Sequence, residues 1–313
     1  MTDLQEQRSA VSVQRSARLA TLPLVPSGPR SGFVRGTAGS IKGVWQYREL
    51  LGLLVRRELK SRYKDSALGF LWSLVRPLMM MIVYVVAIGL FLGASYNSIT
   101  KTGTVDFPVY IFSGLTVWNL FSEIVGAGTG SIINNGGLVK KIYLPREVFP
   151  LATIGSALFN FCIQLIILYC ATWFTRFHPT PEKLLWAVVG TALVLVWATA
   201  LAFLLSAVNV YLRDVAYLVE IVLLFGFWAS PVVYQLQAVQ THLTNGAIDG
   251  TYLGNPVTLA VLAFHRAFWV DGYLTPITDL PMRMALNFVA GLVALWVCQR
   301  VFARLQSNFA QEI

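Results

Sequence analysis

Residues 140–150 form a compact basic segment, KKIYLPREVFP, between two apolar stretches that are each long enough to cross a bilayer. Its chemistry suits a contact with another protein better than a catalytic step. Pro145 and Pro150 stiffen the backbone and so limit the entropy that is lost on docking. We therefore expect a short cytoplasmic connector that binds a partner polypeptide through Lys140, Lys141, Tyr143, Pro145, Arg146 and Glu147.

A second charged pair, Arg213 and Asp214, lies between two later apolar stretches and is expected to meet the same partner. Simpler interpretations stay open for both segments. Lys140 and Lys141 also fit topology anchors under the positive-inside rule. Arg213 and Asp214 also fit a local ion pair at a helix end, which contributes little energy.

The sequence lacks the patterns of an ATPase, a metal site or a nucleophilic enzyme. A Walker motif needs a Gly-Lys step followed by Ser or Thr, and no Gly-Lys step occurs. The histidines His178, His242 and His265 are scattered, and the cysteines lie in apolar runs without Cys-x-x-Cys spacing. We expect that the chain is not an enzyme and binds no cofactor or metal.

Composition indicates a membrane protein. Hydrophobic residues make up 56% of the chain and charged residues only 12%, with a mean hydropathy of +0.63, whereas an average globular domain has about 25% charged residues. The formal charge of +9 is concentrated before Pro77 and beside apolar stretches. The membrane surface is therefore a simpler partner than nucleic acid.

Uncharged stretches of about 20 residues, the length of one helical crossing, recur along the chain. We predict an all-α membrane protein with six transmembrane helices within residues 65–304, and a cytoplasmic tail at 305–313. The apolar segment within 235–279 is too short to span, so re-entrant half-helices are expected there, with a small external cap as the equal alternative. The six spans are expected at residues 77–100, 107–139, 148–175, 184–212, 215–234 and 280–301.

The N-terminal region divides into a tail and a helix. Residues 1–40 are rich in Ser, Arg, Gly and Pro, and we expect a disordered cytoplasmic tail. Residues 41–64 follow a helical pattern with Arg56 and Arg57 on a charged face, although Arg62 falls on the apolar face. A basic amphipathic helix at the inner membrane surface is expected, with a soluble helix packed on a partner as the alternative.

The positive-inside rule orients the chain. With both termini in the cytoplasm, the inner segments hold 19 Lys and Arg residues and the outer segments hold 5. We therefore expect a multi-pass protein of the cytoplasmic membrane with both termini inside.

Three segments together resemble the membrane subunits of ABC-2 type polysaccharide exporters of the O-antigen and teichoic acid type. They are residues 57–78 with RELKSRYK, ALGFLW and PL, residues 114–150 with GLTVW and LVKKIYLPR, and residues 209–257 with NVYLRDV, SPVVY and NPV. Arg76, where the family pattern favours an uncharged or amide residue, and the long N-terminal tail depart from the resemblance. Overall the chain is most similar to the actinobacterial, mycobacterial-type exporters of cell-wall galactan.

This resemblance implies a homodimer that works with two copies of a separate nucleotide-binding ATPase. The implied cargo is an undecaprenyl-pyrophosphate-linked polysaccharide, and membrane lipid is a further partner. Spans one and five are implied to line a channel, where aromatic rings stack on sugar rings. The channel candidates are Tyr84, Phe91, Trp118, Phe121, Phe225, Phe227, Trp228 and Tyr234. Packing in the lipid or at its interface is the alternative for each ring.

Charged residues near and within the spans are the remaining candidates. Glu123 and Glu220 lie within spans two and five, where a carboxylate is costly, so a glycan contact or a gating pair is expected, with plain hydration as the equal alternative. The amphipathic helix is expected to act as a gate that meets the pyrophosphate of the lipid carrier, with binding of anionic lipid as the equal alternative. Its candidate residues are Tyr47, Arg56, Arg57, Arg62 and Lys64.

Two other functions fit part of the sequence. An ABC-2 exporter of a drug or small lipid would share the spans and connectors, but the aromatic content argues against it. A membrane-embedded glycosyl- or acyltransferase would need paired acid-base or nucleophilic residues in one cavity, and it would turn over substrate without an ATPase.

Overall fold

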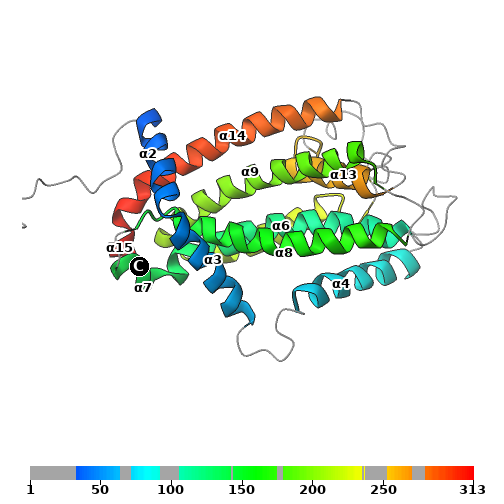
Figure 1. Ribbon diagram of the computed structural model, residues 1–313, viewed down its shortest axis with the longest axis horizontal. Coiled ribbons are helices and arrows are strands. Elements are labelled where there is room, and N and C mark those ends of the chain that lie inside the picture. The colour runs from blue at the N-terminus through cyan, green and yellow to red at the C-terminus, as the bar shows by residue number, and fades with distance from the viewer. Residues whose placement is uncertain are drawn as a thin grey trace, which may run out of the picture.

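Every regular element in the described part of the chain is a helix (Figure 1). The computed structural model describes residues 33–63, 72–91, 106–141, 144–174, 179–234, 236, 252–269 and 279–313. The first and last described helices, α2 (Phe33–Gln46) and α15 (Phe309–Glu312), lie at the same end of the helix bundle (Figure 1). The predicted all-α class is confirmed for these residues.

Four helices are long and apolar enough to cross a membrane, namely α6 (Asp106–Asn134), α8 (Val148–Thr172), α9 (Pro181–Tyr211) and α14 (Leu280–Leu305). They correspond to the second, third, fourth and sixth predicted spans. Each has at least 25 residues, and about 20 suffice for one crossing. α6 packs against α8 and α9, and α14 packs against α9 (Figure 1).

The fifth predicted span is shorter in the structure, and the first is described only in part. α4 (Trp72–Tyr84) continues as the π-helix η2 (Val85–Phe91), and α10 (Val215–Trp228) has 14 residues. Residues 92–100 of the predicted first span lie outside the described residues. The count of six crossings therefore stays a prediction.

α13 (Pro256–Phe268) occupies part of the segment that was predicted to be re-entrant. Asn255 caps the start of this helix by accepting the Val257 amide at 2.9 Å, and proline is favoured at the first helical position because no intrahelical donor is needed there. Nearly all its side chains are buried, because α13 packs against α6 and α9. The structure thus shows one helix buried within the bundle, and a re-entrant path stays a prediction.

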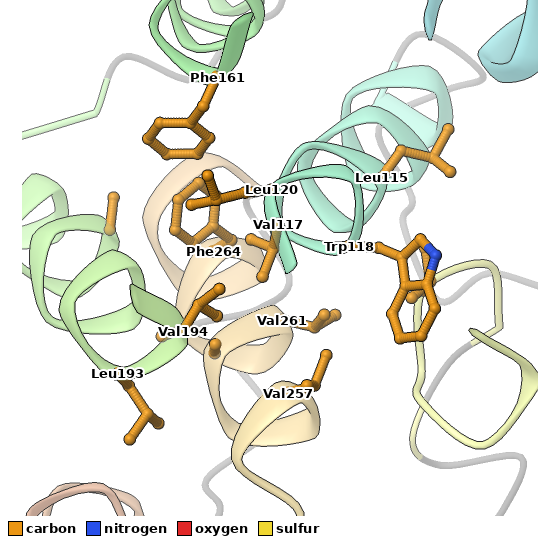
Figure 2. Packing of buried hydrophobic residues seen from close by; sticks show 14 of the residues in the cluster. Leu115, Val117, Trp118, Leu120, Phe161, Leu193, Val194, Val257, Val261 and Phe264 are labelled. Carbon is orange, nitrogen blue, oxygen red and sulfur yellow. The ribbon is translucent and has the colours of Figure 1, made fainter. Parts of the chain in front are cut away.

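The core of the bundle lies where α6, α8, α9 and α13 meet (Figure 2). Phe264 of α13 lies against Phe161 of α8, with ring centroids 6.2 Å apart. Val117 and Leu120 of α6 and Val194 of α9 approach the same place (Figure 2). Since lipid is as apolar as these side chains, close packing holds such helices together in a membrane more than removal from water does.

The N-terminal region holds two helices where one was predicted. α2 includes residues 33–40, which we expected in the disordered tail. α3 (Arg48–Tyr63) follows after a turn at Tyr47 and packs along α8. Residues 1–32 of the predicted tail and residue 64 of the predicted helix lie outside the described residues.

Polar contacts with α14 explain why α2 is helical. The Trp296 indole donates to the Thr37 hydroxyl at 3.2 Å, and the Gln299 amide donates to the Ser40 hydroxyl at 2.9 Å. The two members of each pair are 259 residues apart in the sequence. Local composition, which suggested a tail, therefore carries no sign of these partners.

The C-terminal residues, expected as a tail, are folded. η5 (Gln306–Asn308) and α15 follow α14 directly, and Phe309 is fully buried. Phe309 contacts Phe302 with ring centroids 5.6 Å apart, within an apolar cluster that also contains Phe203 and Val139. Residues 306–313 are therefore part of the end of the bundle.

Candidate functional site

The predicted connector lies at the end of the bundle that also carries α2 and α15, which we call the connector end (Figure 1). α7 (Gly136–Lys141) ends in Lys140 and Lys141, and both side chains are exposed. The candidate Tyr143 lies outside the described residues. Residues 144–147 then lead into α8.

Helix α2 contacts the connector at Glu147. This side chain is buried, and its carboxylate accepts a hydrogen bond from the Ser40 hydroxyl at 3.2 Å. Gln299 of α14 donates to the same Ser40 oxygen at 2.9 Å. Pro145 lies beside Gly43 of α2, where an added methyl group would stand 3.7 Å from the proline ring. Glu147 thus holds the connector against α2 and α14 and is not exposed to a partner.

The second predicted contact, Arg213 and Asp214, lies in the turn between α9 and α10. Both side chains are exposed. Within the described residues they form no ion pair with each other. The structure therefore does not support the alternative of a local pair, and both charges are accessible to a partner.

Phe309 contacts the connector and the last residue of α9, Tyr211. The Arg146 guanidinium lies 5.7 Å from the centroid of the Phe309 ring. The Tyr211 ring, two residues before Arg213, meets the same ring edge to face with centroids 6.2 Å apart. The Tyr211 hydroxyl also donates to the Leu305 carbonyl oxygen at 2.8 Å. The C-terminal residues thereby bring the connector and the α9–α10 turn together.

Two basic residues of the predicted gate helix, α3, hold it to the bundle. Arg62 forms an ion pair with Glu123 of α6, and the Asn160 amide of α8 donates to the same carboxylate oxygen at 2.8 Å. Arg57 donates to the Asn135 side-chain oxygen at the end of α6. Glu123 is therefore paired with a basic residue of the same chain, and its role in gating stays a prediction.

These contacts hold α3 against the side of the bundle, where it crosses the long helices obliquely (Figure 1). Glu123 precedes the last residue of α6, Asn134, by 11 residues (134 − 123), which is about 16 Å of helix. Nearer the start of α3, Val55 fits against Gly155 of α8, where an added methyl group would stand 2.6 Å from a Val55 methyl group. The apolar face of α3 therefore meets α8, while Arg56 is exposed.

The four gate candidates that the structure describes do not form one site. Arg57 donates to Asn135, directly after α6, and Arg62 pairs with Glu123 of α6, whereas Tyr47 and Arg56 are exposed on other parts of the N-terminal helices. Lys64 lies outside the described residues. A pyrophosphate that approached α3 would meet Arg56 directly, but it would have to displace the α6 partners of the other two arginines.

Five of the eight aromatic channel candidates form one cluster between α4, α6 and α10. Phe227 is at its centre, with ring centroids 5.5 Å from Tyr84, 5.7 Å from Trp118 and 5.5 Å from Trp228. Trp118 also contacts Phe121, at 5.7 Å. Rings from the first, second and fifth predicted spans therefore meet in the structure.

Exposure separates the rings that pack from those that can meet a cargo. Trp118 and Phe227 are 8% and 7% exposed, so they pack between helices. Phe91, Phe225 and Trp228 are 83%, 70% and 53% exposed. Only the exposed rings can stack on a sugar, a lipid chain or a second copy without moving other side chains first.

An aromatic group that the sequence did not reveal holds α13 to α6. Tyr110 stacks on His265 with centroids 4.0 Å apart and meets the Trp269 ring at 4.7 Å. Its hydroxyl donates to the Tyr234 carbonyl oxygen at 2.5 Å. The hydroxyl of Tyr234, a channel candidate, donates to the Trp228 carbonyl oxygen at 2.7 Å, so this side chain is tied to the structure around it.

Asn160 and Ser40, which bond to Glu123 and Glu147, were not predicted as site residues. Asn160 could have been found, because a polar amide side chain within an apolar span is uncommon. No feature of the sequence near Ser40 indicated its role. Glu220, the second acidic candidate, is exposed on α10. Among the described residues, no group of three or more His, Cys, Asp or Glu side chains is placed to hold a metal ion.

Comparison with known families decides the assignment. The model of the ABC-2 type transporter family matches residues 49–269, well over half of the chain. The chain belongs to the ABC-2 type transporter family. The part that matches this ABC-2 model includes α3, the connector, the α9–α10 turn and α13.

Curated ABC-2 relatives resemble the chain over most of its length. It is 31% identical to the O-antigen export system permease protein RfbA of Myxococcus xanthus, over 87% of this chain and 98% of that protein. It is 22% identical to an RfbA of Klebsiella pneumoniae, over 84% of this chain and 94% of that protein. It is 23% identical to the polysialic acid transport protein KpsM of Escherichia coli, over 78% of this chain and 88% of that protein.

Proposed function

We propose that the chain is the membrane subunit of an ATP-driven exporter that carries an undecaprenyl-pyrophosphate-linked cell-wall polysaccharide across the cytoplasmic membrane. Two copies form the conduit. Two copies of a separate ATPase subunit, which binds ATP and magnesium, drive transport.

The observation that carries this proposal is the similarity to the Myxococcus permease, because it extends over 98% of that protein. Its name describes O-antigen export, and the name of the Escherichia relative describes polysialic acid transport. Both names give a polysaccharide as the cargo. Within this class, galactan is our choice because of the overall resemblance to the actinobacterial exporters.

The connector end supports a role for a partner ATPase. Lys140, Lys141, Arg213 and Asp214 are exposed there, and the connector behind them is held by buried contacts of Glu147 and Arg146. Exposed charges on a rigid base can transmit a push or pull from a docked protein. We therefore place this end in the cytosol, where ATP is present, and with it α2 and α15.

The aromatic rings support a sugar as cargo. Phe225 and Trp228 on α10 and Phe91 at the end of η2 present large exposed faces. An aromatic face binds the apolar face of a sugar ring weakly and without a fixed direction, which lets a long chain slide. A cargo without sugar rings would bind less favourably to these aromatic faces.

The test has two parts. The chain is depleted in its native host and the lipid-linked glycans that accumulate are identified; it is then reconstituted in vesicles with the ATPase subunit that co-purifies with it. We expect a lipid-linked polysaccharide to accumulate on depletion, and the same molecule to stimulate ATP hydrolysis in the vesicles.

Other outcomes would contradict the proposal. Stimulation by a drug or a small lipid, but not by the glycan, would indicate the other type of ABC-2 exporter. Turnover of the glycan lipid by the purified chain without an ATPase would indicate a membrane-embedded transferase.

A further inference from the structure

We propose that Phe309 is a positioning residue that joins the connector and the α9–α10 turn into one body, so that both move together when the ATPase pulls on either. This inference rests on the proposed function, because it gives the C-terminal residues a part in ATPase coupling. The segment from Gln306 onward lies outside residues 49–269, which the family model matches.

The contacts of Phe309 are the basis of the proposal. Its side chain has no exposed surface, which is unusual for a residue so close to the last described one. The Arg146 guanidinium lies 5.7 Å from its ring centroid, and the Tyr211 ring lies 6.2 Å away at an interplanar angle of 63°. A cation above an aromatic ring and an edge-to-face ring pair are both attractive arrangements.

Two further contacts tie the same segment to its surroundings. The Tyr211 hydroxyl donates to the Leu305 carbonyl oxygen at 2.8 Å. Ile313 lies against Gly136 at the start of α7, where an added methyl group would stand 2.6 Å from an Ile313 methyl group. The C-terminal segment thus touches α7, the connector and the end of α9, which together carry the exposed charges at Lys140, Lys141, Arg213 and Asp214.

A joint of this kind has a mechanical consequence. The connector and the α9–α10 turn are about 70 residues apart in the chain and belong to different pairs of helices. α8 and α9 already pack on each other through the apolar cluster that contains Val148, Phe149 and Phe203. Phe309 adds contacts with Arg146 and Tyr211, next to the exposed charges, so that the two charged segments keep their relative position when either is displaced.

The test compares two leucine variants of the full chain. Phe309→Leu keeps most of the apolar volume but removes the ring that Arg146 and Tyr211 contact. Phe302→Leu is the matched control: Phe302 is equally buried, and its ring contacts are with Phe203 and Phe309. Both variants lose one buried ring from the same cluster, and only the first loses the joint.

The first measurement needs no ATPase. Spin labels are attached at Lys140→Cys and Arg213→Cys, after Cys162, Cys170 and Cys298 are replaced by alanine, and the distance distribution is measured by pulsed electron paramagnetic resonance. We expect Phe309→Leu to widen the distribution about twofold or more, because the two aromatic contacts that limit it are lost. Phe302→Leu should keep the parental width. Equal widths in all three proteins, or equal widening in both variants, would overturn the proposal.

The second measurement uses the complex with the co-purified ATPase subunit. We expect Phe309→Leu to raise the ATP hydrolysed per exported glycan by about five- to tenfold, a loss of coupling on the scale of two weak aromatic contacts, and Phe302→Leu to leave this ratio unchanged. An unchanged ratio in Phe309→Leu would overturn the proposal. If the parental chain recruits no ATPase, the proposed function fails, while the spin-label result still decides whether Phe309 joins the two segments.

Discussion

The carboxylate of Glu123 has two donors, Arg62 of α3 and Asn160 of α8, and this arrangement limits how α3 can move. A carboxylate within a span is costly unless it is paired. Moving α3 away would leave both Glu123 and Arg62 without their best partner. An anionic group that bound Arg62 in place of Glu123 would lower the free-energy cost of moving α3. The pair therefore suits a gate that opens for a negatively charged cargo.

Neutralising Glu123 should loosen α3. The side chains of the ion pair are 29% and 21% exposed, so its contribution lies between that of a surface pair and a buried one, on the order of 1–2 kcal/mol. We expect Glu123→Gln to speed amide hydrogen exchange in the second half of α3 about tenfold. The charge reversal Arg62→Glu with Glu123→Arg should restore slow exchange. Arg56→Gln, on the exposed face of α3, is the control, and slow exchange in Glu123→Gln would contradict the gate.

The neighbouring rings Phe225 and Phe227 should separate transport from stability. Phe227 is 7% exposed and Phe225 is 70% exposed on the same helix. We expect Phe227→Ala to lower the free energy of unfolding by about 3 kcal/mol, because a buried ring leaves a cavity. Phe225→Ala should leave stability within about 0.5 kcal/mol and lower the rate of glycan export in vesicles. Normal export by Phe225→Ala would favour contact with lipid as the role of this ring.

Single residues were predictable where they broke a pattern. Arg62 falls on the apolar face of the predicted helix, and the structure shows that it points to an acidic partner within the bundle. Glu123 stood out as a charge in an apolar span for the same reason. Phe309 and Ser40 broke no pattern, because a phenylalanine near an apolar helix and a serine in a polar region are both ordinary, so only the fold reveals their contacts.

At the scale of elements, α6 and α9 approach each other closely at Gly128. An added methyl group there would stand 2.7 Å from the Ala202 β-carbon and 3.3 Å from its α-carbon. The sequence also contains Gly126-x-x-x-Gly130 in the same helix, and this spacing by itself predicts close helix contact at Gly126 and Gly130. Gly126 instead has only ordinary contact, 3.8 Å from Leu223, and Gly130 faces the Asn134 amide of its own helix. The motif indicated the right helix but the wrong positions.

Alanine at two positions of α6 tests this packing. Gly128→Ala should lower the free energy of unfolding by about 1–3 kcal/mol, because the new methyl group meets backbone-linked carbon atoms that cannot rotate away. Gly126→Ala should raise it by up to about 1 kcal/mol, since alanine favours helix and space is available. Thermal unfolding in detergent measures both. A stable Gly128→Ala and a destabilised Gly126→Ala would show that α6 is rotated relative to this structure.

The elements that sequence reasoning placed correctly are those with a long apolar run. α6, α8, α9 and α14 are expected from length and hydropathy alone, because each is longer than one crossing. Residues 33–40 of α2 and the helix α15 were not expected to be helical, since each segment has partners far away in the sequence. α4 and α10 fall between these cases, as apolar segments whose helices are shorter than a full span.

At the scale of the whole molecule, large apolar side chains remain exposed on α4, α10 and α14. In a membrane such faces meet lipid or another protein, and only the second requires a matching surface. η2, which continues α4, and α10 also carry the channel candidates with exposed rings. A second copy placed against these two helices would turn their aromatic faces toward a shared interior, which is how a homodimer would form the proposed conduit.

The connector end should be separable from the conduit by mutation. Arg213→Ala with Asp214→Ala removes two exposed charges from the α9–α10 turn and leaves the buried joint around Phe309 intact. We expect the dissociation constant for the ATPase subunit to rise about tenfold, roughly 1.4 kcal/mol, with unchanged thermal stability of the chain. Binding of a labelled ATPase subunit to nanodiscs that contain each variant measures this effect.

The control for this variant lies at the opposite end of the same helix. Glu182→Ala with Lys183→Ala changes two charges near the start of α9, about 45 Å of helix away from the turn, so it should bind the ATPase as the parental chain does. Weaker binding in both double variants would point to a general effect of charge on the nanodisc surface. If the variant with both Arg213 and Asp214 replaced binds the ATPase and exports glycan as the parental chain does, this turn is not part of the coupling surface. The connector alone would then transmit the work of ATP hydrolysis.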